Sequence, residues 1–125
     1  MKEETREWIR LAESDLRVAR RESRVIDEPS YSAVCFHAQQ AAEKLLKAFL
    51  QEHDIPIIKT HDLVYLLEQI LPLKPLWSVY RKQLEELTEY AVTSRYPGEE
   101  ATKDMALEAT RLAGEIHKVL IAEIG

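Results

Sequence analysis

The segment from Thr93 to Gly98 combines turn-forming residues with residue types that bind anions. A turn accounts for Pro97 and Gly98, but it requires neither Arg95 nor Tyr96. An arginine at the end of a helix either pairs with nearby carboxylates or binds an anion such as phosphate. The sequence leaves both interpretations open for Arg95.

A second residue that could carry chemistry is His61, which lies between Thr60 and Asp62. Imidazole is the side chain that exchanges protons near neutral pH. Asp62 is ordinary in the first turn of a helix, where a carboxylate suits the helix dipole. We expect His61 to be a local hydrogen-bond partner, with a catalytic role as the alternative.

A polar stripe runs along the segment 30–53 at spacings of three and four residues, so its side chains share one helix face. It consists of His37, Gln40, Lys44, Lys47 and Gln51. A solvated face is one interpretation, and a polar groove at a dimer or partner interface is the other. In the second case, two lysines among amides could hold a phosphate.

The densest basic cluster is formed by Arg17, Arg20, Arg21 and Arg24. Cations are favoured at the C-terminal end of a helix, which is a structural reason for the cluster. Contact with phosphate or RNA is the alternative interpretation.

Metal and thiol chemistry find little support in the sequence. Di-metal helical bundles use Glu-x-x-His pairs, and none of the four histidines has a glutamate three residues before it. The single cysteine, Cys35, falls among apolar residues, so a buried inert thiol is favoured over a nucleophile. We expect no metal, no cofactor and no intrachain disulfide.

Composition limits the class of protein that must position these residues. The chain has 125 residues and a net charge of −5, which predicts one domain over residues 1–125 and argues against nucleic-acid binding by bulk charge. Any such contact would need a local patch. No apolar run is long enough to cross a membrane, and no signal peptide is evident, so we expect a cytoplasmic protein.

Five prolines divide the chain into segments rich in helix-forming residues, with no sustained alternation of apolar and polar residues. The predicted helices span residues 3–25, 30–53, 61–71, 76–94 and 99–123. Ser30 and Thr60 are the expected N-caps of the second and third helices. Glu99 and Glu100 favour the start of the last. Four long helices with short connections predict an all-α, antiparallel, up-and-down four-helix bundle, with 61–71 as a short additional helix.

Four sequence features resemble the HEPN domain family. Residues 39–48, QQAAEKLLKA, resemble its second-helix signature, and residues 60–63, THDL, resemble its conserved turn. Residues 94–97, SRYP, resemble its Arg-Tyr-Pro segment. Trp8, Ala12, Asp15 and Leu16 fit its usual opening. The resemblance implies a helical bundle of prokaryotic origin that often forms a homodimer and often has a minimal nucleotidyltransferase as its partner.

Many HEPN proteins are metal-independent RNA endonucleases, some of them toxins of toxin–antitoxin pairs. Their mark is an arginine followed by four to six residues and a histidine. Arg95 is the matching arginine, but no histidine follows it at that spacing. Arg111 and His117 have the spacing, but they lie well after the expected place, and six positions on a helix point two side chains about 120° apart.

The resemblance therefore implies a HEPN-type interaction module that dimerises, pairs with a nucleotidyltransferase and binds a nucleotide or RNA phosphate. The resemblance places its polar focus at Arg95, Tyr96, His61, Lys44 and Lys47. The alternative is a metal-independent RNA endonuclease that uses Arg111 and His117, or a set around Arg95 and His61. A third interpretation is an oligomeric scaffold without a ligand.

Overall fold

The computed structural model describes residues 1–93 and 96–124, and every regular element in these ranges is helical. The elements are α1 (Glu3–Ser23), α2 (Tyr31–Glu52), α3 (Leu63–Ile70), the 3₁₀-helix η1 (Pro75–Tyr80), α4 (Arg81–Thr93) and α5 (Lys103–Ile124).

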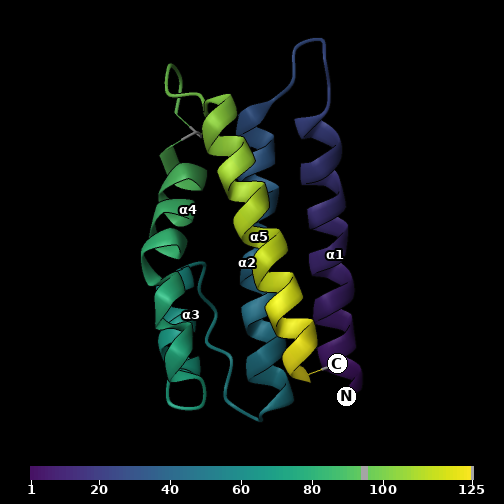
Figure 1. Ribbon diagram of the computed structural model, residues 1–125, viewed down its shortest axis with the longest axis vertical. Helices are drawn as coiled ribbons and strands as arrows, with labels where there is room; N and C mark the ends of the chain where they lie inside the picture. Colours follow the sequence, from purple (N-terminus) through teal and green to yellow (C-terminus); the bar gives the residue numbers. More distant parts are fainter. Residues whose placement is uncertain (94–95, 125) are drawn as a thin grey trace.

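The four long helices form the expected antiparallel up-and-down bundle (Figure 1). α1 and α4 lie on opposite sides of the molecule and run in the same direction, while α2 and α5 run back between them (Figure 1). α3 is the short additional element, and it lies beneath α4 in this view. The start of α1 and the end of α5 lie at the same end of the bundle (Figure 1).

α2 is the central helix because it packs against α1, α3, α4 and α5. Four of its alanines, Ala38, Ala41, Ala42 and Ala48, are fully buried and let neighbouring helices approach closely. Phe49 fills the lower core, where its ring centroid lies 5.2 Å from that of Trp77 in η1. One apolar cluster therefore runs through all the helices.

The predicted N-cap of α2 is confirmed, but that of α3 is wrong. Ser30 Oγ accepts a hydrogen bond from the backbone N–H of Ala33 at 3.2 Å. α3 begins at Leu63 rather than at residue 61, and its N-cap is Asp62, whose Oδ1 accepts from the N–H groups of Val64 and Tyr65. Thr60 instead accepts from the N–H of Asp62, one step earlier in the same turn.

The assignment of Asp62 as the N-cap of α3 predicts how its replacement changes the free energy of unfolding. Replacing Asp62 with alanine leaves two N–H groups of the first turn without their acceptor, so we expect the free energy of unfolding to fall by about 1 kcal/mol. Urea denaturation followed by circular dichroism measures the change. Thr60→Ala is the matched variant, and a larger loss there than at Asp62 would contradict the assignment.

Two other predicted helices differ from the structure at their N-terminal ends. Residues 75–80 form a 3₁₀-helix before α4, with Pro75 in its first turn and Trp77 buried in the core. α5 begins at Lys103, so Glu99 and Glu100 precede the helix rather than occupying its first turn.

Candidate functional site

A buried carboxylate on α2 holds the exposed imidazole of His61. Glu43 is only 4% exposed, and its Oε1 lies 2.8 Å from His61 Nδ1. An ionised carboxylate can only accept a hydrogen bond, so the proton of this contact belongs to Nδ1. Nε2 of the neutral ring is then left as an acceptor, on a side chain that is 81% exposed.

Two neighbouring side chains complete this arrangement. Gln39 Nε2 donates to the backbone carbonyl of His61 at 3.1 Å, which fixes the loop that carries the ring. Lys47 Nζ lies 3.0 Å from Glu43 Oε2 and 5.6 Å from the ring centroid of Trp8. Because Lys47 is 7% exposed, its charge neutralises that of Glu43 inside the protein.

His61 lines a pocket of about 380 Å³ between α2, the loop before α3 and α4. The lining residues are Gln39, His61, Asp62, Thr88, Ala91 and Val92. The α4 wall of this pocket ends at Thr93, the last residue of the helix. Arg95, the predicted anion-binding arginine, follows two residues later in the sequence and lies outside the described residues.

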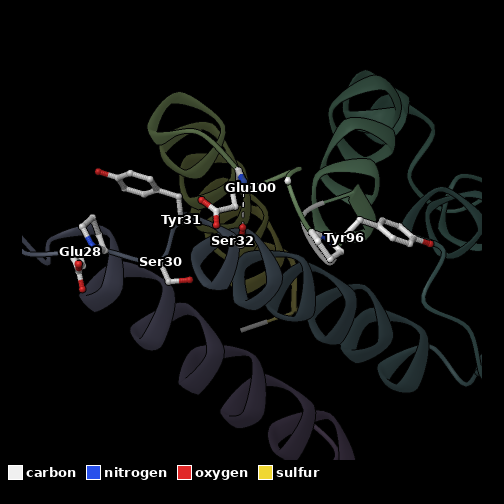
Figure 2. Close-up of a pocket in the computed structure, with 10 residues that line it drawn as sticks. Glu28, Ser30, Tyr31, Ser32, Tyr96 and Glu100 are labelled. Carbon is white, nitrogen blue, oxygen red and sulfur yellow. Dashed lines mark hydrogen bonds between the residues drawn. The ribbon is translucent and has the colours of Figure 1, made fainter.

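Tyr96 lines a different hollow, of about 490 Å³, between the start of α2 and the loop before α5. Figure 2 shows that the rings of Tyr31 and Tyr96 point away from this hollow on opposite sides. Ser32 Oγ accepts from the backbone N–H of Ala101 at 3.1 Å and joins the two segments. Glu28 and Glu100 also line the hollow, and two carboxylates disfavour a phosphate there.

The polar stripe of α2 lies against α1 within the same chain. His37 Nδ1 lies 3.0 Å from Asp15 Oδ1, and Lys44 pairs with the other oxygen of Asp15. The stripe is therefore an internal seam between two helices for most of its length. The ammonium groups of Lys44 and Lys47 each have a carboxylate partner, Asp15 and Glu43.

Arg111 and His117 have different partners on α5. Arg111 Nη1 lies 3.4 Å from Glu115 Oε2, one turn along the same helix. His117 Nε2 lies 2.8 Å from Glu13 Oε2 on α1. The structure thus gives the two side chains separate ion-pair partners and shows no contact between them.

The thiol of Cys35 is fully buried in α2. Burial raises its pKa to about 11 from the ordinary value of 9.0, because the thiolate would lose its hydration. The thiol is therefore protonated at neutral pH and unsuited to act as a nucleophile.

This pKa shift predicts a pH dependence of stability. Between pH 9 and pH 11 the unfolded chain releases the Cys35 proton while the folded chain retains it, so stability falls as the pH rises through this range. Urea denaturation across this range should show a steeper decline for the wild type than for Cys35→Ala. Identical slopes for the two proteins would contradict the shift.

Sequence reasoning missed the role of Glu43. The available signal was the spacing of Gln39, Glu43 and Lys47, three polar residues four positions apart in a helix whose surrounding residues are mostly apolar.

Within the described residues, no group of three or more potential metal-ligating side chains gathers. No helix there is long and apolar enough to cross a membrane.

Comparisons with known proteins agree with this architecture. A solved structure described as TT1696 from Thermus thermophilus superposes with a TM-score of 0.82 at 23% sequence identity, and the match covers 97% of this chain and 98% of that one. A search of the curated proteins gives no match. The family model of the HEPN domain matches residues 5–124, nearly the whole sequence. The chain therefore belongs to the HEPN domain family.

Proposed function

We propose that this protein is a HEPN-type interaction module that pairs with a second copy of itself through the outer face of α3, η1 and α4. We further propose that it docks a minimal nucleotidyltransferase and binds a nucleotide or RNA phosphate at the His61 pocket. The observation that carries the proposal is the uncovered apolar surface of η1 and its neighbours.

η1 presents apolar side chains to both sides. Trp77 points into the core, whereas Leu76 and Val79 are 84% and 70% exposed. Residues three apart in a 3₁₀-helix are eclipsed, so these two side chains share one outer face. Tyr65 of α3, which packs against η1, and Leu73, which precedes η1, are exposed as well. Val92 is also exposed, but it lies at the other end of α4, beside the His61 pocket. We take the exposed apolar side chains around η1 as the interaction site.

The His61 pocket belongs to the same half of the molecule, because α4 forms one of its walls. In the proposed site, His61 Nε2 faces the ligand and Arg95 supplies the charge that the family resemblance assigns to it. A second copy docked on α4 would close the pocket further. Pairing and phosphate binding are therefore expected to be coupled.

Sedimentation velocity of the purified chain tests the pairing. We expect a dimer whose population grows with protein concentration and changes little with salt, because the proposed contact is mainly apolar. A monomer at every concentration would overturn self-pairing.

Size-exclusion chromatography with a minimal nucleotidyltransferase from the host genome tests the second partner, and separate elution of the two proteins would count against it.

A metal-independent RNA endonuclease is the second candidate, and the contact between Glu43 and His61 favours it. A carboxylate that fixes the tautomer of an exposed imidazole is a common arrangement for a general acid or base. Incubating the protein with total RNA in EDTA, beside His61→Ala, Arg95→Ala and His117→Ala variants, separates the candidates. Cleavage that persists in EDTA and disappears in His61→Ala would make the protein a nuclease, whereas intact RNA throughout supports the binding module.

A further inference from the structure

We infer that the arginine stripe of α1, formed by Arg17, Arg20, Arg21 and Arg24, binds the phosphate backbone of a polynucleotide strand. This inference goes beyond the proposed function, because the stripe is separate from the docking face and from the His61 pocket. α1 contacts α2 and α5 but makes no contact with α3, η1 or α4 in the described chain. Figure 1 places α1 and α4 on opposite sides of the bundle.

The four arginines are exposed residues and lack ion-pair partners among the described residues. The other arginines of the described chain are all ion-paired: Arg6 with Glu3, Arg10 with Glu7, Arg81 with Glu68 and Arg111 with Glu115. The helix dipole favours cations in the last turn, where Arg20 and Arg21 lie. It does not explain why the whole stripe remains unpaired.

Three of the acidic residues nearest in sequence, Glu13, Asp15 and Glu22, make contacts elsewhere, whereas Asp27 and Glu28 lie in the loop beyond the helix. Glu13 lies 2.8 Å from His117 on α5, and Asp15 binds side chains of α2. Glu22 Oε2 accepts a hydrogen bond from the backbone N–H of Ser30 at 2.7 Å. Although the net charge of the chain is −5, the described residues leave these four arginines on one helix face without an ion pair.

Gly114 of α5 leaves space for the side chain of Arg20. A Cβ at this position would lie 3.1 Å from Arg20 Nη2, closer than most such contacts allow. The absence of a side chain lets the Arg20 guanidinium rest beside α5 at the edge of the stripe.

The geometry of the stripe fits a linear polyanion. Spacings of three, one and three residues place the four side chains along about 10 Å of one helix face. Guanidinium groups bind phosphate oxygens in a bidentate manner. Arginine occurs in both kinds of interface, but the centres of protein–protein interfaces are depleted of charge overall, whereas nucleic-acid interfaces are strongly positive. A row of four arginines without ion pairs therefore favours a nucleic-acid strand over an acidic protein.

A membrane surface fits the stripe less well. Ile26 is exposed at the tip beyond the helix and could enter a bilayer, but Asp27 and Glu28 follow it and are exposed as well. Two carboxylates beside the apolar tip would be repelled by an anionic headgroup layer. We therefore assign the stripe to a strand that lies along the helix, read by charge and without preference for base sequence.

Fluorescence anisotropy with a labelled oligouridylate and a labelled oligothymidylate tests the inference. We expect similar binding of both strands, with log K falling against log salt at a slope of about −3 if all four arginines contact phosphate. The variant R17Q/R20Q/R21Q/R24Q should bind at least about tenfold more weakly and show a flatter slope. R6Q/R10Q, which removes two ion-paired arginines of the same helix, should match the wild type.

Three outcomes would overturn the inference: no strand binding by the wild type, equal binding by the stripe variant, or a preference for polyglutamate or for mixed phosphatidylcholine–phosphatidylserine vesicles over both strands. A His61→Ala variant separates this inference from the proposed function. Loss of strand binding in His61→Ala alone would favour the pocket and reject the stripe. Loss in the stripe variant alone would support the stripe and leave the pocket without a role in strand binding.

Discussion

Glu43→Ala is expected to lower the free energy of unfolding by about 3–5 kcal/mol, because it leaves the buried Lys47 ammonium without its counter-charge. The carboxylate also holds His61 and lies 3.5 Å from Gln39 Nε2, so its removal takes a partner from three polar groups at once. Urea denaturation at a fixed protein concentration measures the loss and keeps any dimer contribution constant.

A double replacement distinguishes the cost of leaving Lys47 as an unpaired buried charge from the cost of losing the ion pair itself. Glu43→Leu with Lys47→Met removes both charges and retains side-chain volume, so it should recover most of the stability lost in Glu43→Ala. Glu7→Ala, which breaks the exposed pair with Arg10, should change stability by less than about 1 kcal/mol. A loss in Glu43→Ala no larger than in Glu7→Ala would contradict the described network.

Leu76→Ser with Val79→Ser is expected to weaken self-association by about 100-fold, since central apolar side chains carry much of the free energy of an interface. Both side chains are exposed in the single chain, so its melting temperature at high dilution should barely change. Sedimentation velocity measures the dissociation constant, and circular dichroism reports the melting temperature.

Leu107→Ser is the matched control for this pair of replacements. Leu107 is an exposed apolar residue on α5, outside the proposed docking face. Its replacement should leave the dissociation constant unchanged. Equal weakening in Leu107→Ser and in the double variant would place the contact on α5 instead.

The helical bundle could be predicted because its signals are local. The apolar residues Leu63, Leu66, Leu67 and Ile70 recur at helical spacing, and all four are buried. The helix boundaries were harder to predict, because the choice between Thr60 and Asp62 as the N-cap of α3 depends on how the preceding loop folds back. The predicted helix 76–94 likewise misses the 3₁₀-helix at residues 75–80, where Trp77 packs against Phe49 from a distant part of the chain.

The site was harder to predict because its contacts join distant parts of the chain. The sequence singles out His61, but its partner Glu43 lies 18 positions earlier, and helical spacing alone does not pair the two. Lys44 and Lys47 looked free to hold a phosphate because their carboxylates, on Asp15 and Glu43, become apparent only once the helices are packed.

Hydrogen–deuterium exchange at low and high protein concentration tests the central claim most directly, because it reports both whether copies associate and where. Raising the concentration is expected to slow exchange in α3, η1 and α4 and to leave α1 unchanged. Slower exchange confined to α1 and α5, or no concentration dependence in any helix, would contradict a module that pairs through the face carrying Leu76 and Val79.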